Sequence, residues 1–458
     1  MKEIYLVNYS VNGIKTIDKT VSLSFYKKTF QKDFDTQEYN IKGIYGMNGS
    51  GKTGIIASVD ILKKLLITPD YLNNLIIQTE LDEIINKKTQ QLSIEADFVV
   101  NVKAPLPLFR YNVVLSRDYT GKYVISKEQL SFKNANTRTD KFNVLFQVTE
   151  GVLTNFFDKA DSEFVDFFKE KTMNLLSSNS VSALFFEKVL TATSRDEDYK
   201  DDTLFFGIFS LFVFGTKLHV FLDQSDNHSE YIIQSSYNLL ENIKKHTSQF
   251  NKLMKQLLTV NMENLNVFTT HRNIVPKNTL KYFENTVHKL CDFLRIFKSD
   301  LKDIEVEKKE DNDVYICSLI MVYDAYRIHS EFESTGIKKL ITLFAYLTEM
   351  VQGGIVFIDE FDSNLHDVYL CALLEYLMEY GEGQLCFTTH NVGPMDILKK
   401  NKKSIDFLSV DHKIYPWTSN GNYSPSKLYR NGMIEGSPFN VDSIDFIKAF
   451  HIDEEADA

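Results

Sequence analysis

Residues 46–53 read Gly-Met-Asn-Gly-Ser-Gly-Lys-Thr, and this octapeptide constrains the fold more than any other feature of the sequence. It matches the pattern GxxxxGK[ST], in which glycines let backbone N–H groups turn inward around phosphate oxygens. An apolar and aromatic run, 41–45, precedes it, and apolar residues at helical spacing follow over 55–66. Strand, glycine-rich turn and helix together are the context that a phosphate-binding loop requires.

In a phosphate-binding loop, the backbone, the lysine and the hydroxyl residue each have a distinct role. The loop backbone and the start of the following helix would surround phosphate oxygens with N–H groups. Lys52 would reach the β- and γ-phosphates, and the Thr53 hydroxyl would ligate Mg²⁺. The residues that we expect to contact the phosphates here are Gly46, Asn48, Gly49, Ser50, Gly51, Lys52 and Thr53.

A second segment with candidate catalytic residues is the apolar run 355–358, which is followed by Asp359 and Glu360. A buried strand of this kind delivers its last side chains to the carboxyl edge of an α/β sheet, where ligands bind. Asp359 would hold Mg²⁺ through water, and Glu360 would orient or deprotonate an attacking water molecule. The alternative is a solvated strand end, but the phosphate-binding loop upstream favours the functional interpretation.

Two further polar segments are candidates for the same site. Residues 385–390 form a short strand pattern that ends in Thr-Thr-His, so His390 could contact a γ-phosphate. Ser334 is a plausible N-cap of a helix, and together with Gly336 it would make an anion site at that helix N-terminus. The competing interpretations are a surface histidine and a simple helix cap.

The distribution of strand and helix signals predicts how the chain is organised. Short β-branched and aromatic runs mark the first 45 residues and residues 92–148, whereas 150–300 is poor in glycine and shows helical spacing, as in 155–171, 239–258 and 282–297. Strand signals return after residue 303. We therefore expect an α/β fold: residues 1–149 and 301–458 would build one unit with a parallel sheet and an antiparallel β-subdomain, and 150–300 a helical insertion.

Composition narrows the class of protein. The formal net charge of −11 gives no general affinity for nucleic acid, although a local basic groove would not show in this sum. The four cysteines form no CxxC pair, which argues against a zinc site and fits a cytoplasmic protein. The most apolar stretch, 204–215, is shorter than a membrane span and predicts a buried helix, and the N-terminus shows no signal peptide.

The order of these segments resembles the ABC-type ATPase heads of the group that includes SMC, RecF and overcoming-lysogenisation-defect (OLD-like) proteins. Residues 46–53 match the Walker A motif of that group, including its Asn and Ser. Asp359 and Glu360 match the Walker B aspartate and the catalytic glutamate, and His390 matches the switch histidine. The resemblance covers roughly 1–140 and 300–430, and it implies ATP and Mg²⁺ as ligands and ATP hydrolysis as the activity.

The resemblance also implies an assembly. In that group two heads enclose two ATP molecules, and each site joins Walker A of one subunit to the signature motif of the other. Ser334 and Gly336 match that signature, although Glu-Ser-Thr-Gly departs from LSGGQ, so they would act in trans in a homodimer or higher homo-oligomer. Residues 363–366 look like the D-loop of the subgroup. The candidates for the Q-loop glutamine are Gln91, Gln129 and Gln147.

Within this group the chain looks most like the stand-alone ATPases of bacterial phage-defence systems of the PARIS or abortive-infection type. That likeness implies an ATPase that senses infection and controls a nuclease or toxin encoded nearby. The chain itself shows no Toprim nuclease pattern. The alternative is a DNA-repair or chromosome-maintenance ATPase that binds DNA directly, for which 399–403 is a basic cluster. A transporter ATPase fits less well, because of the unusual signature and the helical insertion.

Overall fold

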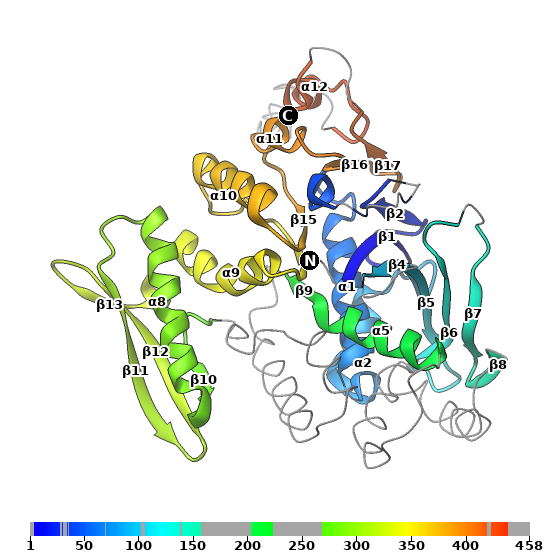
Figure 1. Ribbon diagram of the computed structural model, residues 1–458, viewed down its shortest axis with the longest axis horizontal. Coiled ribbons are helices and arrows are strands. Elements are labelled where there is room, and N and C mark those ends of the chain that lie inside the picture. The colour runs from blue at the N-terminus through cyan, green and yellow to red at the C-terminus, as the bar shows by residue number, and fades with distance from the viewer. Residues whose placement is uncertain are drawn as a thin grey trace, which may run out of the picture.

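The computed structural model describes residues 4–27, 30, 34, 36–68, 70–101, 106–137, 140–156, 203–222, 268–418 and 423–437. Two large sheets and the helices between them make up most of the described chain, and a smaller sheet with its own helix stands apart from them (Figure 1). The expected α/β fold, with a parallel sheet and an antiparallel β-subdomain, is confirmed. Three further described helices are α2 Leu75–Ile84, α11 Met395–Leu398 and α12 Pro425–Arg430.

The sheet that carries the motifs has the order β17-β16-β3-β15-β14-β9. All neighbours in it are parallel except β17, which pairs with β16 in antiparallel fashion. Its strands β3, β14 and β15 are buried on both faces, as the continuous apolar runs of the sequence indicate. The strand bounds are β3 Ile41–Gly46, β9 Leu218–Phe221, β14 Ile355–Ile358, β15 Gln384–Thr388, β16 Ile405–Leu408 and β17 Ile414–Pro416.

Helices cover the two faces of this sheet. On one face, helices α9 (Thr335–Val351) and α10 (Asp367–Tyr380) share a core cluster with Tyr45, Ile358 and Phe387. On the other face, α1 (Lys52–Ile67) packs against alternate residues of the same strands, such as Ile44 and Phe357. Because successive side chains of a strand point to opposite faces, one short strand serves both cores.

The antiparallel sheet has seven strands in the order β2-β1-β4-β5-β6-β7-β8. It shares the α1 core cluster, so α1 is buried nearly all round. The side-chain amide of Gln384, at the start of β15, joins the two sheets: its Oε1 accepts from the Leu6 N–H at 2.7 Å and its Nε2 donates to the Leu6 carbonyl at 2.9 Å. The strands are β1 Ile4–Asn12, β2 Val21–Ser24, β4 Gln91–Val100, β5 Pro107–Arg117, β6 Tyr123–Asn134, β7 Asn143–Thr149 and β8 Val152–Phe156.

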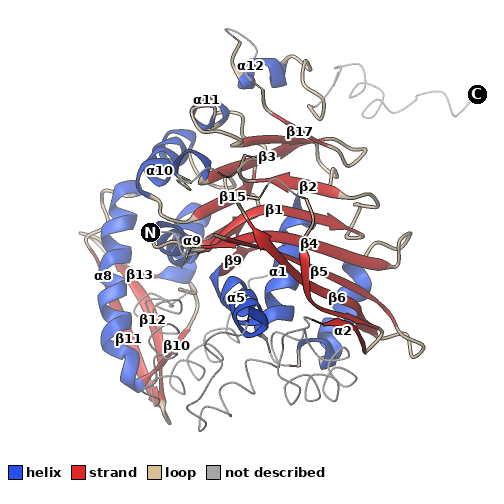
Figure 2. Cartoon of the chain, turned by 45° about the vertical axis from the view of Figure 1, so that its right-hand side comes forward, coloured by secondary structure: helices blue, strands red, loops and turns tan. Residues whose placement is uncertain are grey.

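Residues 203–221 differ from the helical insertion that the sequence predicts over 150–300. Helix α5 (Thr203–Lys217) is the expected buried helix, but it packs beside α1 within the main core (Figure 2). Strand β9 follows it directly and pairs with β14, so this part of the range belongs to the parallel sheet. The expected helices at 155–171 and 239–258 lie almost entirely outside the described residues, and the domain boundaries therefore stay a prediction.

A separate lobe carries the third expected helix and the strands that follow it. Helix α8 (Leu280–Phe297) packs its buried side chains, such as Val287 and Leu290, on one face of a small antiparallel sheet. The first half of α9 contributes to the same cluster through Leu340 and Ile341, so α9 links the lobe to the main body (Figure 1). The strands are β10 Asn273–Pro276, β11 Asp303–Asp311, β12 Val314–Val322 and β13 Arg327–His329.

All four cysteines are free thiols, and three of them are buried. Among the helices that the structure describes, none combines the length and the apolar content needed to cross a bilayer.

A buried ion pair fixes β3 against its neighbour β16. The Lys42 Nζ lies 2.7 Å from the Asp406 Oδ2, with both side chains almost fully buried, and it also donates to the Lys403 carbonyl at 2.5 Å. Removing one partner of such a pair leaves a buried charge unpaired, which costs roughly 3–5 kcal/mol. The pair therefore fixes how the strand that leads into residues 46–53 sits in the sheet.

A second buried polar cluster lies at the other edge of the parallel sheet, where α1, α5, β9 and α9 meet. The His219 Nε2 is 3.5 Å from the Glu349 Oε2, with Lys63 and Lys217 nearby. Burial raises the pKa of Glu349 to about 7, although Lys217 and Lys63 oppose the shift. Burial, then Lys63 and Lys217, hold the pKa of His219 well below its usual value, so the two groups do not form an ion pair at neutral pH.

This cluster predicts a pH-dependent effect of Glu349→Gln. Because folding raises the pKa of Glu349 from 4.5 to about 7, the folded protein holds a proton that the unfolded chain has lost between these pH values. The contribution of Glu349 to wild-type stability therefore falls as the pH rises across this interval, by on the order of 3 kcal/mol. The amide of the variant cannot ionise, so we expect Glu349→Gln to gain stability relative to wild type as the pH rises from 4.5 to 7.

The measurement is the unfolding midpoint in urea at a pH near 5 and at a pH above 7. Glu375→Gln is the matched control, since Glu375 is exposed and pairs with Lys400 at the surface. An unchanged difference between Glu349→Gln and wild type at the two pH values would contradict the burial of an ionisable Glu349 in the folded state.

Candidate active site

The predicted functional segments converge at the carboxyl edge of the parallel sheet. Strand β15 lies between β3 and β14, with Thr388 opposite Ile44 and Ile358 opposite Phe387. All three strands run in the same direction, so the residues that follow them emerge side by side. The loop 46–53, the pair 359–360 and His390 therefore meet at one edge, although they are far apart in the sequence.

The loop 46–53 has the backbone that an anion-binding turn needs. Gly49 and Gly51 have positive φ values of 79° and 104°, and Gly51 stands at the N-cap of α1 without a side chain to cover the free N–H groups. Lys52 is buried, and its Nζ donates to the carbonyls of Gly46 at 2.8 Å and Met47 at 3.0 Å. The Ser50 hydroxyl is fully buried and has no hydrogen-bond partner among the residues that the structure describes.

The end of β14 is organised by a threonine of the neighbouring strand. The Thr388 Oγ1 donates to the Asp359 Oδ1 at 2.5 Å and accepts from the Glu360 N–H at 2.8 Å. Asp359 is thus buried and oriented, whereas Glu360 is exposed. Glu360 has a φ of 48°, a left-handed conformation that costs a non-glycine residue roughly 1–2 kcal/mol. Such local cost is often found at functional sites.

Lys52, His390 and the carboxylates that follow β14 interact electrostatically. Burial lowers the pKa of Lys52 to about 8, and the charges of Asp359, Glu360 and Asp362 oppose the shift. The pKa of His390 is also lowered, first by loss of solvent around the ring and then by the charge of Lys52, while the same three carboxylates oppose it. The same three carboxylates, Asp359, Glu360 and Asp362, thus interact with both Lys52 and His390.

Ser334 and Gly336 lie at the start of α9, beside the turn that follows β14. The Ser334 Oγ accepts from the Ile337 N–H at 3.4 Å, so the expected N-cap is confirmed. A Cβ on Gly336 would lie 2.6 Å from the Asn364 carbonyl oxygen, and only glycine allows this close approach. Ser334 itself is exposed.

The acid that departs from LSGGQ, Glu333, has a structural explanation. Its side chain is buried and accepts a hydrogen bond from the Tyr323 hydroxyl, and the Lys298 Nζ lies 3.3 Å from its Oε2. Lys298 also lies over the Tyr323 ring at 4.5 Å. Glu333 thus fixes the segment before Ser334 to the lobe that carries α8.

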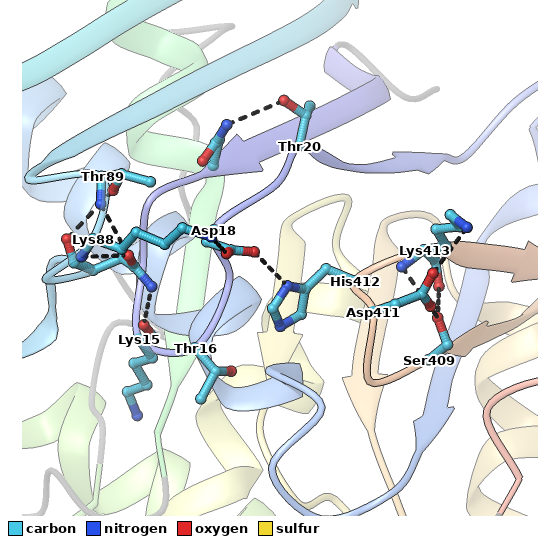
Figure 3. A network of polar contacts seen from close by, with 12 residues as sticks. Lys15, Thr16, Asp18, Thr20, Lys88, Thr89, Ser409, Asp411, His412 and Lys413 are labelled. Carbon is cyan, nitrogen blue, oxygen red and sulfur yellow. Dashed lines mark hydrogen bonds and ion pairs between the residues drawn. The ribbon is translucent and has the colours of Figure 1, made fainter.

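The loop between β1 and β2 covers residues 46–53, and this role was not predicted from the sequence. The Thr16 Oγ1 donates to the Gly49 carbonyl at 3.3 Å, and a Cβ on Gly51 would lie 2.7 Å from the Ile17 Cγ1. Figure 3 shows how this loop is anchored: Asp18 points toward Lys88 on one side and His412 on the other, with contacts of 2.6 and 3.1 Å. No recognised motif marks the loop, so its sequence gives no signal of this role.

The Q-loop glutamine stays unassigned. Gln129 and Gln147 lie opposite each other on β6 and β7, and Gln91 begins β4. All three therefore belong to the antiparallel sheet. By contrast, β9 brings Phe221 to the carboxyl edge beside Asp359, whose N–H donates to the Phe221 carbonyl at 2.9 Å.

The residues present fit a nucleoside triphosphate with Mg²⁺. The Gly49 Cα faces open space, since a Cβ there would meet no described atom within 4 Å, and the buried Ser50 hydroxyl can still accept or donate a hydrogen bond. Magnesium in such sites takes one or two protein oxygens and completes its shell with phosphate oxygens and water. The Thr53 hydroxyl and the Asp359 carboxylate are oxygen ligands of the required type.

One comparison with known proteins identifies a family. A family model described as "AAA domain, putative AbiEii toxin, Type IV TA system" matches residues 41–396. Two solved structures of the recombination mediator protein RecF in the RecFOR pathway, with "ATPrS" and with ATP, are 12% identical and cover 91% of this chain and 99% of theirs. Their TM-scores, 0.34 and 0.31, are too low to support an argument. No curated protein matches the chain in sequence.

The loop geometry predicts different effects of two alanine substitutions. Both Gly49→Ala and Gly51→Ala place a side chain at positive φ, but only the Gly51 methyl group would collide with Ile17. Overpacking of this kind costs about 1–3 kcal/mol beyond the backbone strain. We expect Gly51→Ala to lower both thermal stability and nucleotide affinity more than Gly49→Ala does. Equal melting temperatures and equal affinities of the two variants would disprove the contact between the β1–β2 loop and residues 46–53.

Proposed function

The chain belongs to the family of AAA domains described as putative AbiEii toxin of a type IV toxin–antitoxin system, and we propose from this premise that it binds ATP with Mg²⁺ and hydrolyses it at the carboxyl edge of β3, β15 and β14. The observation that carries the proposal is the convergence of residues 46–53, Asp359, Glu360 and His390 at one edge of the parallel sheet. A phosphate-binding loop alone would support binding. The carboxylates beside it add the means for hydrolysis.

The positions of these residues support the following roles. The N–H groups of 49–53 and the start of α1 bind the phosphates, and Lys52 leaves the carbonyls of Gly46 and Met47 to pair with phosphate oxygens. Thr53 would ligate Mg²⁺ and Asp359 would hold it through water, and the ion would supply positive charge near the phosphates. Glu360 orients the attacking water and accepts its proton, and His390 contacts the γ-phosphate.

The catalytic assignment predicts that Glu360→Gln and Lys52→Ala fail at different steps. Glu360→Gln removes the proton acceptor, so its hydrolysis rate should fall about 10²–10⁴-fold while ATP still binds. Lys52→Ala should lose ATP binding itself. Phosphate release and calorimetric titration with ATP measure the two steps, and the exposed Glu375→Gln is the control for loss of an acid. Wild-type hydrolysis by Glu360→Gln would overturn the catalytic assignment.

We further propose that two copies of the chain share two ATP sites, with Ser334 and Gly336 of one copy completing the site of the other. The start of α9 is open to a partner: Ser334 and Thr335 are exposed, and Phe332, two residues before Ser334, leaves 72% of its surface uncovered. Large exposed apolar side chains next to a polar motif are typical of interaction sites.

Shared sites predict complementation between two inactive variants. Lys52→Ala and Ser334→Arg each damage both sites of a homodimer, but a mixed dimer retains one intact site, built from the unaltered Lys52 of one copy and the unaltered Ser334 of the other. Random mixing of equal amounts should therefore restore about a quarter of wild-type ATPase activity, because half of the dimers are mixed and each has one working site. A mixture no more active than the sum of its parts would exclude sites of this kind.

The biological role that we propose is antiviral: ATP binding and hydrolysis would switch the surface that holds a nuclease or toxin encoded nearby, in response to phage infection. The family description, which names a toxin and a toxin–antitoxin system, supports this choice. The alternative is an ATPase that binds DNA directly. It has less support, because the net charge is −11 and the basic cluster is partly neutralised. Its lysines at 399, 400 and 402 form ion pairs with Asp396, Glu375 and Glu38.

A phage challenge separates the two roles. Cells that carry the chain with its neighbouring genes should reduce phage plating, and Lys52→Ala should abolish that protection. If plating is the same with wild type and with Lys52→Ala, the antiviral role is wrong. Binding of duplex DNA by the purified protein, weakening steeply with salt, would instead favour the alternative.

A further inference from the structure

Lys339 is a buried cation that has no role in the reaction proposed above. It lies in the second turn of α9 and is only 7% exposed. Its Nζ donates to the Glu360 carbonyl at 2.5 Å and to the Ser363 hydroxyl, and it lies 6.0 Å from the centre of the Phe221 ring at the end of β9. A lysine is rarely buried unless polar partners hold its ammonium group, and here those partners belong to the turn after β14.

The contacts of Lys339 complete the fixation of the Glu360 backbone. On the preceding side, the Glu360 N–H donates to the Thr388 Oγ1 at 2.8 Å. On the following side, the Glu360 carbonyl accepts from Lys339 and from the Ser363 N–H at 3.0 Å, and the Phe361 N–H donates to the Thr388 carbonyl at 3.0 Å. Both peptide units that flank Glu360 are thus held by neighbours, which is what a non-glycine residue at a φ of 48° requires to persist.

The same turn is fixed to the start of α9. The Thr335 Oγ1 donates to the Asn364 Oδ1 at 3.3 Å, and Gly336 packs directly on the Asn364 carbonyl. Asn364 also has a positive φ, 60°. Residues 360–364 and the first turns of α9 therefore form one unit, and Ser334 stands exposed at its end.

We propose that Lys339 is a positioning residue for hydrolysis: it holds the Glu360 carbonyl, and thereby the direction of the Glu360 side chain, to the helix that begins with Ser334. A shift of α9 on contact with a partner subunit is transmitted to Glu360 through the ammonium group. This inference rests on the proposed function, since it assumes that Glu360 acts on the attacking water.

The first test is a comparison of kcat and KM. Lys339→Met keeps the apolar stem and removes the donor, so Glu360 should lose its direction while the phosphate loop is unchanged. We expect kcat to fall about 100-fold, the order of effect that a misplaced catalytic group has, with the KM for ATP within about 2-fold of wild type. Lys339→Arg, which keeps a cationic donor, should recover part of the loss. Lys338→Met, one residue away, is the matched control and should match wild type.

A second comparison distinguishes positioning from general damage. If Lys339 acts through Glu360, then adding Lys339→Met to Glu360→Gln should not lower the residual rate further, because the group being positioned is already gone. A variant that merely weakens the fold would lower the rate about 100-fold in both backgrounds, and this result would overturn the proposal. If Lys339→Met does not fold, Lys339→Leu, which also lacks a donor, takes its place in the same comparison.

The outcomes separate this inference from the proposed function. If wild type hydrolyses ATP and Lys339→Met is equally fast, only the role of Lys339 is wrong. If wild type does not hydrolyse ATP, or Glu360→Gln is as active as wild type, the proposed function fails and the role of Lys339 fails with it.

Discussion

The position of β15 between β3 and β14 is the constraint on which the rest of the site depends. The strand of the phosphate-binding loop and the strand of Asp359 do not pair with each other, so their ends are held together by the strand between them. Thr388 adds two hydrogen bonds to this link, because its hydroxyl donates to the Asp359 carboxylate and accepts from the Glu360 N–H. Any displacement of β15 would separate the loop from the carboxylates and misdirect both acids at once.

Buried polar contacts fix the register of these strands where apolar packing alone would not. Lys42 and Asp406 pair inside the core, and Gln384 makes two hydrogen bonds with the backbone of Leu6. Apolar contacts tolerate sliding, but a buried polar group must meet its partner or lose the free energy of a hydrogen bond. These contacts therefore specify one arrangement of β3, β15 and the antiparallel sheet. This arrangement determines where the site residues lie.

The sequence predicts those parts of the site that carry a signal within a short stretch of the chain. The loop 46–53 is recognisable because glycine spacing, the preceding strand and the following helix all lie within residues 41–66, and Asp359, Glu360 and His390 follow short apolar strands. Strand β9 was not predicted, since its partner β14 is far away in the sequence and four residues carry little signal of their own. The roles of Thr16 and Lys339 were also missed, because each depends on a tertiary contact and on no motif.

The most direct measurement is a crystal structure of the protein with Mg²⁺ and a non-hydrolysable ATP analogue. We expect the triphosphate over residues 49–53, the metal between the Thr53 hydroxyl and the Asp359 carboxylate, and the Lys52 Nζ moved from the carbonyls of Gly46 and Met47 to the phosphates. A nucleotide bound elsewhere, or a triphosphate on the loop with Asp359 and Glu360 turned away from it, would contradict the claim that the two distant segments form one site.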